Sequence, residues 1–555
     1  MGSERVGEKE NRTVIAEELI RPMVADRAPL FRPPGYWTDR TVYDYLCDAA
    51  AEGPERIALV DSTQCLTYAE YLERSRRVAS WLVDTGLTND DILAIQLPNW
   101  CEFAIAINAA ASVGVPFCQF HSGFSEGEVE FVLRHSEARA VIVPSAFRGR
   151  KYAEMIDRLR PRLPNLEHCL SVGPWDGKEW TDLRVVSMEY PVDEHKLSKR
   201  KPSADDIMRV AFTSGTTSEP KAVVHTHNSS LGTKPQNIVD EHVDESSVVL
   251  VFMPVGLNWG LGETIRAVMS RSRVVYMDHF DAEVAIDLIA AEKVTHMAAA
   301  PAALVSLMDA KNFSRDEIAS LELVVMGGAP CPPVVAERWR ASAPGALLER
   351  YGMLEIGTGA RTVVEDDPAD VGASVGTISP DGAVRIVGED GSDLPVGEIG
   401  EILFRGPGVS FGYYKNPTST AETYLPGGWF RTGDLGFVDS AHRLYIAGRR
   451  KEMLIRAGAN VYPREIEEAL LLHPKVADCA IVGVPDERVG EKIAAVVVPR
   501  SGQSVTLGSV RDFLSTRVAS YKQPELLYVS EELPRTPTGK VQRHLIDLSS
   551  LGGAL

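Results

Sequence analysis

The chain has 555 residues, of which 44% are hydrophobic and 24% charged, and this composition is ordinary for a globular protein of two or more domains. The net charge of −19 argues against a nucleic-acid partner, whose phosphates would be repelled, and means that an anionic substrate needs local basic residues. Seven scattered cysteines without a C-x-x-C pair indicate free thiols in a reducing compartment and argue against a metal or disulfide framework.

Residues 1–36 are expected to form an irregular lead-in. The first residues are charged and lack the apolar core of a secretory signal, so we expect a cytoplasmic protein. The most apolar run, 103–120, breaks at Gly114 and Pro116. This pattern predicts a core helix followed by a strand, and no membrane span.

From residue 41 onward, helical and extended patterns alternate, which predicts parallel sheets in an α/β fold. The apolar spacing predicts helices over 41–52 and 66–86 and strands over 57–61, 92–97, 137–145, 246–255, 272–278, 294–301 and 321–330. From Val384, short strands between Gly, Pro and Asp turns indicate a small β-subdomain. A second change of pattern separates two predicted domains, 1–450 and 451–555, and the latter has its own α+β pattern.

The stretch 212–221, FTSGTTSEPK, follows an apolar pair that can end a strand. Its small hydroxyl residues and Gly215 allow a loop to approach a polyanion closely. Hydroxyl and main-chain N–H groups donate to phosphate oxygens, and Lys221 supplies a countercharge. The spacing is not that of a Walker A loop. A polar surface linker is the alternative interpretation.

Three other strand ends carry unusual residues, at 254–260, 327–330 and 351–355, and ligands of α/β sheets gather beyond such ends. The turn at 327–330 lacks bulky side chains, so a flat base can lie against it, although a plain strand-to-helix turn has the same composition. Glu355 suits Mg²⁺, which prefers hard oxygen ligands. The alternative for Glu355 is a solvated loop carboxylate.

His225 and His227 are two residues apart, so they share one face if this segment is a strand. No cysteine or third histidine lies nearby in the sequence. We therefore expect structural histidines at these positions and not a metal site.

In their order along residues 40–545, these stretches resemble the motifs of the adenylate-forming superfamily, which contains acyl-CoA synthetases, free-standing adenylation enzymes and luciferases. FTSGTTSEPK is similar to the family's phosphate signature (Y/F)TSGTTGxPKG, and YGMLE at 351–355 is similar to its YGxTE motif. GWFRTGD at 428–434 matches the family's motif, and PRTPTGK at 534–540 resembles its C-terminal catalytic motif.

The chain departs from the family pattern at three positions. Ser218 and Ala222 stand where glycine is usual, which narrows the backbone freedom of the phosphate loop. Leu354 stands where threonine is usual, so a hydroxyl group that contacts phosphate in the family is missing. This loss is expected to bear on the efficiency of the first half-reaction.

The resemblance implies a role for individual residues. Lys540 would be catalytic, offsetting the charge that builds between substrate carboxylate and α-phosphate, and Glu355 would be catalytic as the Mg²⁺ ligand. The implied phosphate loop consists of Thr213, Ser214, Gly215, Thr216, Thr217 and Lys221. The implied adenine and ribose contacts are Gly328, Ala329, Pro330, Tyr351, Gly352, Asp434 and Arg449. The implied hinge is Lys451, and the implied CoA contacts are Ala457 and Gly458.

The segment 254–260 corresponds to the family's entrance to the acyl pocket, where a ring is common at the position of Leu257. Leu257, Asn258, Trp259 and Met353 would line an apolar and adaptable pocket, and the neighbouring glycines would leave space. Neither this segment nor the YGMLE stretch contains a basic residue to pair with a second carboxylate. We therefore expect a bulky hydrophobic monocarboxylic acid, either alicyclic, polycyclic or medium-chain, with aryl acids next.

The implied fold is α/β, with a large N-terminal domain of two parallel-type α/β layers plus a β-subdomain and a small mobile α+β C-terminal domain. The implied reaction uses ATP, Mg²⁺ and coenzyme A to convert the acid into acyl-CoA, in natural-product or fatty-acid metabolism. The alternatives are a free-standing adenylation enzyme that loads a separate carrier protein, a luciferase-like oxygenase, and a non-catalytic acyl- or nucleotide-binding relic. The sequence leaves the oligomeric state open, with a homodimer among the alternatives.

Overall fold

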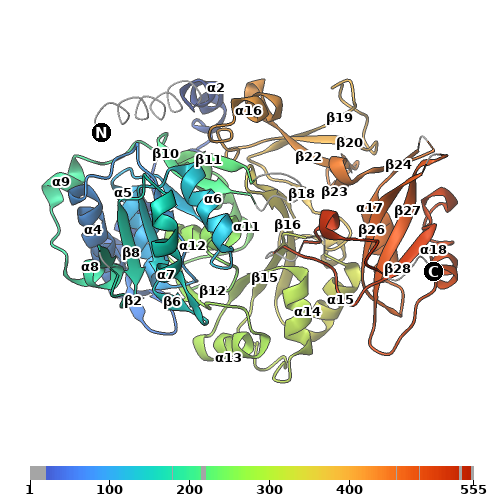
Figure 1. The fold of residues 1–555 in the computed structure, drawn as a ribbon, viewed down its shortest axis with the longest axis horizontal. Coiled ribbons are helices and arrows are strands. Elements are labelled where there is room, and N and C mark those ends of the chain that lie inside the picture. The colour runs from blue at the N-terminus through green and yellow to red at the C-terminus, as the bar shows by residue number, and fades with distance from the viewer. Residues whose placement is uncertain are drawn as a thin grey trace.

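The computed structural model describes residues 20–177, 179–213, 220–329, 331–457, 459–486, 488–536 and 540–551. Its α/β fold confirms the predicted class. Figure 1 shows the two large sheets with their helices in the blue-to-yellow part of the chain, a β-subdomain in orange, and a small C-terminal domain in red at one end. Within the described part of the chain, no helix is both long and apolar enough to cross a membrane.

A seven-stranded sheet has the order β11-β10-β4-β3-β5-β8-β9, and all of its neighbouring strands are parallel except β10 and β11. Its strands are β3 (Leu93–Ile95), β4 (Phe117–Gln119), β5 (Ala140–Pro144), β8 (His168–Val172), β9 (Trp180–Asp182), β10 (Ile207–Phe212) and β11 (Ala222–Thr226). All five residues of β5 are buried. Parallel strands covered on both faces have such continuous apolar runs, which made them recognisable in the sequence.

A nine-stranded sheet has the order β18-β17-β16-β15-β14-β12-β13-β1-β2. Its strands are β1 (Ile57–Val60), β2 (Cys65–Thr67), β12 (Val248–Val251), β13 (Arg273–Tyr276), β14 (His296–Ala299), β15 (Leu323–Gly327), β16 (Ala346–Met353), β17 (Gly357–Arg361) and β18 (Thr377–Ile378). The strands from β16 to β1 in this order are parallel. Their carboxyl ends therefore meet at one edge, where β12, β15 and β16 deliver the three unusual strand ends.

Helices cover both sheets, and every residue of α5 is buried. Threonine capping boxes at Thr41 and Thr67 begin α3 and α4, two helices that the sequence predicted. The helices of this part are α3 (Val42–Glu52), α4 (Tyr68–Asp84), α5 (Cys101–Ser112), α6 (Glu126–Ser136), α7 (Tyr152–Leu159), α8 (Leu183–Glu189), α9 (Glu194–Ser198), α10 (His227–Leu231), α11 (Lys234–Asp240), α12 (Asn258–Ser270), α13 (Ala282–Glu292), α14 (Pro301–Asp309) and α15 (Pro333–Ser342). The largest apolar core joins α3, α4, α5 and α12 with strands of both sheets.

The remaining strands form two smaller sheets. The β-subdomain contains β19 (Ala383–Val387), β20 (Gly400–Arg405), β21 (Tyr424–Leu425), β22 (Trp429–Val438), β23 (Leu444–Arg449) and the helix α16 (Pro417–Thr423). The C-terminal sheet contains β24 (Leu454–Arg456), β25 (Ala459–Val461), β26 (Val476–Asp486), β27 (Gly490–Pro499) and β28 (Leu526–Val529), and it packs with α17 (Pro463–Leu471) and α18 (Leu507–Leu514). The short helix η5 (Arg450–Glu452) lies between the two sheets. The domain boundary at this point stays a prediction.

The expectation of an irregular lead-in is wrong for part of it, because Arg21–Phe31 form the helix α2. This helix has no apolar stripe to announce it, and it contains Pro29. Its buried Arg27 donates hydrogen bonds to the carbonyl oxygens of Val409 and Ser410, over 2.9 and 2.8 Å. A tertiary contact between residues far apart in sequence thus holds the helix in place, and periodicity alone did not reveal it.

Candidate active site

The predicted phosphate loop is closed where β10 ends and β11 begins. The Thr213 N–H donates to the Lys221 carbonyl oxygen over 2.9 Å, and the Lys221 N–H donates to Thr213 Oγ1 over 3.1 Å. Ala222, one of the departures from the family pattern, is buried in β11 opposite Phe212. Outside the described residues lie Ser214, Gly215, Thr216, Thr217 and Ser218.

Lys221 has electrostatic neighbours from three other parts of the chain. Its Nζ lies 4.3 Å from the centre of the Tyr413 ring, which is a cation–π contact. Desolvation lowers the pKa of Lys221, the charge of Lys451 lowers it further, and Glu355 acts in the opposite direction. The predicted phosphate lysine, hinge lysine and Mg²⁺ carboxylate therefore lie around one region.

Glu355 is half-buried just beyond β16, and its Oε1 accepts a hydrogen bond from Tyr413 Oη over 3.3 Å. Burial raises the pKa of this carboxyl group, while Arg449 and Lys221 act to lower it. In the ranges that the structure describes, no three His, Cys, Asp or Glu side chains gather as a metal site. A single carboxylate still fits Mg²⁺, because this ion commonly takes one or two carboxylates together with substrate phosphates and waters.

Asp434 is buried in β22 and joins two of the predicted nucleotide contacts. Its Oδ2 accepts a hydrogen bond from Tyr351 Oη over 2.5 Å, and its Oδ1 lies 2.7 Å from Arg449 Nε. Asp434 and Arg449 stand directly opposite each other in the β22–β23 ladder, which is why two separate motifs meet. An ionised carboxylate is an acceptor-only group, as recognition of two sugar hydroxyls requires.

Lys540 approaches the same region from the C-terminal domain, and its side chain is still reached by solvent. Desolvation lowers the pKa of Lys540, and the charge of Arg449 lowers it further. Asp434, Glu355 and Glu452 act in the opposite direction. The ammonium group therefore lies within electrostatic range of both predicted nucleotide carboxylates.

The segment that carries Lys540 is anchored on both sides. The Thr536 N–H donates to the Lys540 carbonyl oxygen over 2.8 Å, and the Lys540 N–H donates to Thr536 Oγ1 over 3.1 Å. Arg543 pairs with Glu452 in η5 over 2.7 Å and with Glu467 in α17 over 2.8 Å. These bonds connect the lysine loop to the predicted hinge region.

Ala457, one of the two predicted CoA contacts, directly follows β24. Ala457 has a left-handed backbone with φ of 50°, and its N–H donates to the Val489 carbonyl oxygen over 2.7 Å. Gly458 lies outside the described residues, as does Pro330 of the predicted adenine turn.

The described part of the adenine turn, after β15, lies against the indole of Trp259. A Cβ atom on Gly327 would come within 2.9 Å of Trp259 Cη2 and 2.8 Å of the Arg350 carbonyl oxygen, and one on Gly328 within 3.3 Å of Trp259 Cζ3. Gly328 also has a φ of 76°, which favours glycine. One flank of this bare turn is therefore occupied by an indole ring of the chain itself.

The prediction that glycines leave space in the acyl pocket is wrong for Gly256 and Gly260. A Cβ on Gly256 would lie 2.3 Å from the Phe120 carbonyl oxygen, and one on Gly260 would lie 2.3 Å from the Met253 carbonyl oxygen. Both glycines permit close approach of backbone, which fills the space a side chain would take. Leu257, which we predict to lie at the pocket entrance, is half-buried.

Two basic residues that the motif stretches do not contain lie beside the start of α12, where the entrance is predicted. Arg209 in β10 donates from Nη2 to Asn258 Oδ1 over 2.8 Å. Lys234, at the start of α11, places Nζ 3.0 Å from the position that a Cβ on Gly262 would occupy. Sequence reasoning missed both, because it searched only the stretches around 257 and 353. The signal for Arg209 was available, since it is a lone arginine in an otherwise apolar strand, IMRVAF.

Met353 and Leu354 are half-buried and pack on an apolar cluster that includes Val223 and Phe404. The Leu354 carbonyl oxygen accepts a hydrogen bond from His225 Nε2 over 2.8 Å. Burial holds the pKa of His225 well below its usual value, which favours a neutral ring. The condition for a common strand face of His225 and His227 is not met, because the chain changes from β11 to α10 at residue 227.

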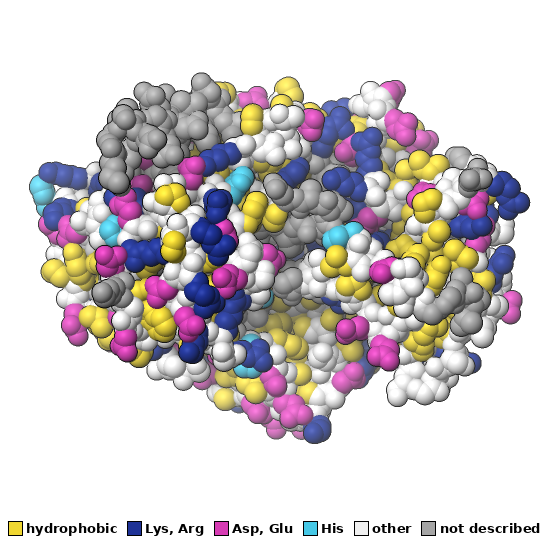
Figure 2. Space-filling view, viewed as in Figure 1, with side chains coloured by type: hydrophobic (Ala, Val, Ile, Leu, Met, Phe, Trp, Pro, Cys, Tyr) yellow, Lys and Arg dark blue, Asp and Glu magenta, His cyan; other side chains and the backbone are white. Residues whose placement is uncertain are grey.

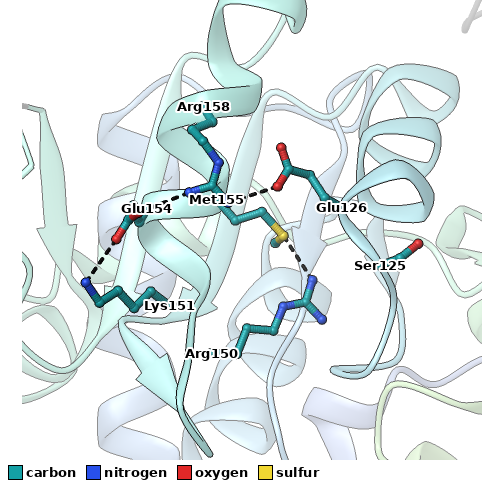
Figure 3. A pocket seen from close by; sticks show the side chains of 7 residues that line it. All are labelled: Ser125, Glu126, Arg150, Lys151, Glu154, Met155 and Arg158. Atoms are coloured by element: carbon teal, nitrogen blue, oxygen red, sulfur yellow. Dashed lines mark hydrogen bonds and ion pairs between the residues drawn. The ribbon is translucent and has the colours of Figure 1, made fainter.

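A pocket elsewhere on the surface, between α6 and α7, is drawn in Figure 3. Figure 2 shows Lys and Arg side chains gathered over this side of the molecule. Most charges that line the pocket are paired with each other, since Arg158 contacts Glu126 and Glu154 over 2.9 and 3.1 Å, and Lys151 contacts Glu154 over 3.2 Å. Arg150 contacts the Met155 sulfur and the Ser122 carbonyl oxygen instead. This pairing makes the pocket a weak candidate for an anion site.

Comparison with known proteins agrees with this two-part architecture. The model of the AMP-binding enzyme family matches residues 46–414, and the model of the AMP-binding enzyme C-terminal domain matches residues 465–540. The chain is 30% identical to the medium-chain fatty-acid–CoA ligase of Escherichia coli (strain K12), over 94% of this chain and 92% of that protein. It is 31% identical to a salicylyl-CoA synthase / salicylate adenylyltransferase of a Streptomyces species, over 95% and 97%.

The fold is also similar to solved structures. ATP-bound MatB from Rhodopseudomonas palustris superposes with a TM-score of 0.83 at 26% identity, covering 91% of this chain and 98% of that one. The folded arrangement defines an adenylate-forming enzyme of two unequal domains. The chain belongs to the AMP-binding enzyme family. This membership confirms the predicted enzyme class of AMP-forming acid–thiol ligases, and it supports ATP binding.

Proposed function

We propose that this protein is an ATP-dependent acyl-CoA ligase for a bulky hydrophobic monocarboxylic acid. In the first half-reaction, a carboxylate oxygen forms a bond to the α-phosphorus of ATP, and the bond to pyrophosphate breaks. In the second, the thiolate sulfur of coenzyme A attacks the acyl carbon of the mixed anhydride, and AMP leaves. The anhydride makes a poor electrophile reactive.

The observation that carries this proposal is the position of Lys540. It comes from the C-terminal domain to within electrostatic range of Asp434 and Glu355, which belong to the other domain. A cation at this place offsets the negative charge that builds when the carboxylate approaches the α-phosphate. In the proposed second half-reaction, the C-terminal domain turns about Lys451 and carries Lys540 away, and such rearrangements often limit turnover.

The other residues have binding roles in this proposal. Asp434 binds the ribose hydroxyls with Arg449 beside it, and Lys221 with the loop from Thr213 binds the phosphates. Glu355 holds Mg²⁺, which shields phosphate charge when bound. The adenine lies between Tyr351 and the turn of Gly328, Ala329 and Pro330, beside Gly352. Coenzyme A binds beside Ala457 and Gly458.

A carrier protein is the second candidate acceptor of the acyl group. One relative's name combines a CoA synthase with an adenylyltransferase, and a neighbouring one is called pyochelin synthase PchD, from Pseudomonas aeruginosa. The first half-reaction is the same for both acceptors. We propose coenzyme A, because a medium-chain fatty-acid–CoA ligase and a 4-coumarate–CoA ligase are among the relatives. Their alignments cover 94% and 90% of this chain.

The proposed acid follows from the lining of the entrance. Leu257, Trp259 and Met353 offer apolar surface, and each additional buried methylene contributes about 0.8 kcal/mol to binding. The rate constant kcat/KM should therefore rise from acetate toward larger acids until the entrance limits it. We also propose a cytoplasmic location, which the seven free cysteines support. A homodimer is an open alternative, and light scattering would test it.

One assay tests the proposal. The protein is mixed with MgATP, coenzyme A and a panel of acids, and acyl-CoA, AMP and pyrophosphate are followed by mass spectrometry. We expect all three products with a medium-chain or cyclic acid. Pyrophosphate without acyl-CoA would favour the carrier-protein acceptor, and transfer to a phosphopantetheinylated carrier would then be measured. No pyrophosphate with any acid would contradict the proposal and favour a non-catalytic relic.

A further inference from the structure

Arg209 is a buried arginine whose hydrogen bonds are incomplete. Only 4% of the residue is exposed. Its Nε donates to Ser230 Oγ over 3.2 Å, and its Nη2 donates to Asn258 Oδ1 over 2.8 Å. Its Nη1 is buried and has no hydrogen-bond partner among the described residues. A guanidinium group in the protein interior is thus fixed in place by two neutral partners with one donor nitrogen left over.

Arg209 also has no counter-ion in the part of the chain that the structure describes, because no carboxylate there lies within ion-pair distance. The nearest buried ion pairs are complete without it. Arg266 and Arg350 both pair with Glu241 and Glu263, which gives two positive and two negative charges. An uncompensated buried charge is costly, so its presence calls for a partner that the chain itself does not supply.

A second cation lies on the same side. Lys234 is half-buried, and its Nζ stands against Gly262, one helical turn after Asn258 on α12. Asn258 and Gly262 therefore form one face of α12, toward which both Arg209 and Lys234 are directed. Burial and the nearby Arg350 lower the pKa of Lys234 to about 7, while Glu263 acts in the opposite direction.

This face of α12 adjoins the proposed acyl pocket. Asn258 is the residue between Leu257 and Trp259, and the Trp259 indole lies against the turn at Gly327. The Trp259 Nε1–H is likewise buried without a partner among the described residues. Unpaired N–H groups thus come from two elements, β10 and α12: Arg209 contacts Asn258, and Trp259 follows Asn258 in the chain. Leu257 and Met353, by contrast, offer only apolar surface to the acid.

We propose that Arg209, held by Asn258 and Ser230, is a specificity-determining residue that binds an oxygen acceptor on the acid, remote from the reacting carboxylate. The substrate class is then an apolar acid that carries a hydroxyl, keto or second carboxylate oxygen. This inference rests on the proposed function, since it concerns the acid that is activated. A site built to hydrogen-bond a substrate oxygen rejects the analogue that lacks it, because the buried polar group is then left unpaired.

The test compares matched pairs of acids: each hydroxybenzoic acid against benzoic acid, hydroxynaphthoic against naphthoic acid, and octanedioic against octanoic acid. For each acid, kcat/KM is measured by pyrophosphate release, and the dissociation constant is measured by calorimetry. We expect kcat/KM of the best oxygen-bearing acid to be on the order of 10- to 100-fold higher than that of its parent, and its dissociation constant to be lower by a similar factor. If the largest ratio is that of octanedioic over octanoic acid, the inference is supported. The substrate of the proposed function is then a dicarboxylic and not a monocarboxylic acid.

The variants are Arg209→Met, which keeps the length of the side chain without its charge, and Asn258→Leu. We expect both variants to reduce the ratio of kcat/KM between the two acids of the best pair to about onefold to threefold. In Arg209→Met the substrate oxygen loses its hydrogen-bond donor, and in Asn258→Leu the Arg209 side chain loses the partner that holds it in place. Arg511→Met, an exposed arginine in α18, is the matched control and should leave the ratio unchanged. If Arg209→Met does not fold, as judged by its melting curve, Arg209→Lys and Asn258→Leu give the decision.

The outcomes separate the two proposals. Equal kcat/KM and equal dissociation constants within every pair in the unchanged protein would overturn the inference, and so would an equal loss for both members in Arg209→Met. In either case, acyl-CoA formation would leave the proposed function standing. Absence of pyrophosphate with all acids would contradict the proposed function. Calorimetry would still decide the role of Arg209 in binding the acids.

Discussion

The two ends of the candidate site are built in different ways. At the nucleotide end, Asp434, Tyr351 and Arg449 are already bonded to each other, and Lys540 stands within range of them. At the acyl end, Arg209 is bonded only to neutral partners and keeps a free donor among the described residues. The first end is preorganised by the chain itself, whereas the second lacks a partner that we expect the substrate to supply.

This difference suggests where binding energy is used. Preorganised groups aimed at developing charge lower the barrier, since they need no rearrangement during the reaction. Unpaired groups at the far end select among substrates, because only a matching substrate removes their burial cost. Substitutions at the nucleotide end should then act on every acid alike, and those at the acyl end should act on the ranking of acids.

The largest effect is expected from Lys540→Ala. Losing one charge-stabilising donor typically costs about a hundred- to thousandfold in rate, so adenylate formation should nearly stop for all acids. Preformed acyl-adenylate should still react with coenzyme A, because the cation serves only the first step. Single-turnover assays of the two half-reactions measure this, with the exposed Lys475→Ala as control. An equal loss in both half-reactions would argue against a domain rotation.

The next largest effect is expected from Asp434→Asn. The neutral amide leaves Arg449 without its counter-ion and removes one acceptor that Tyr351 and the ribose hydroxyls share. A hydrogen bond to a charged group contributes about 1.5–3 kcal/mol, so KM for ATP should rise on the order of 10- to 100-fold for every acid. Asp393→Asn, in an exposed pair with Arg385, is the matched control. A change that depends on which acid is used would break the division between the two ends.

The sequence indicated which residues meet at Asp434, and it did not indicate the contact between Arg209 and Asn258. The proposed nucleotide contacts lie in contiguous motifs, such as GWFRTGD, in which local backbone geometry already orders the residues. The hydrogen bond between Asp434 and Tyr351 still joins motifs from two sheets, and only the order of motifs indicated it. At the acyl end, Arg209 lies in β10 of the seven-stranded sheet, whereas Asn258 begins α12, which follows β12 of the nine-stranded sheet in the chain. No local pattern therefore connects the two residues.

The glycines illustrate the same limit. A glycine in a sequence can mean empty space for a ligand or close contact with another part of the backbone. Gly256 and Gly260 are in the second situation, because carbonyl oxygens of Phe120 and Met253 lie where their side chains would be. The partner in such a contact is set by tertiary packing, and a single sequence does not contain it.

A moderate effect on stability is expected from substitution of Glu349, a buried residue of β16 that contacts the segment after the predicted adenine turn. Its buried carboxylate accepts hydrogen bonds from the N–H groups of Cys331 and Gly372, over 3.3 and 2.9 Å, and Cys331 follows the adenine turn. Burial raises its pKa from 4.5 to about 7. The carboxyl group is neutral in both states below the unfolded pKa. Above the unfolded pKa, Glu349 is ionised in the unfolded chain but still neutral in the folded protein. The free energy of unfolding therefore falls as the pH rises through the folded pKa.

The measurement is urea unfolding of the wild type and Glu349→Gln across this range of pH. The wild type should lose about 2 kcal/mol of unfolding free energy, relative to the variant, between pH 5 and pH 7. The exposed Glu398→Gln should show no such difference in slope. Parallel pH profiles for the wild type and Glu349→Gln would contradict the buried titration. Because the group lies behind the nucleotide end, any effect on rate should be the same for all acids.

The smallest expected effect, and the one that tests the acyl end most directly, is that of Leu257→Trp. Leu257 precedes α12, its N–H donates to the Pro254 carbonyl oxygen over 3.0 Å, and its side chain is half-buried. A larger ring at this position would overfill the proposed entrance, because the neighbouring Gly256 already packs against the Phe120 carbonyl oxygen. We expect kcat/KM for cyclic or medium-chain acids to fall about tenfold more than for acetate, since one misplaced group in an apolar pocket costs about 1–3 kcal/mol. Leu472→Trp, at an exposed leucine beyond α17, controls for the added indole. If Leu257→Trp slows all acids alike, or if acetate is the best substrate of the wild type, Leu257 does not line the acyl pocket and the division between the two ends fails at this residue.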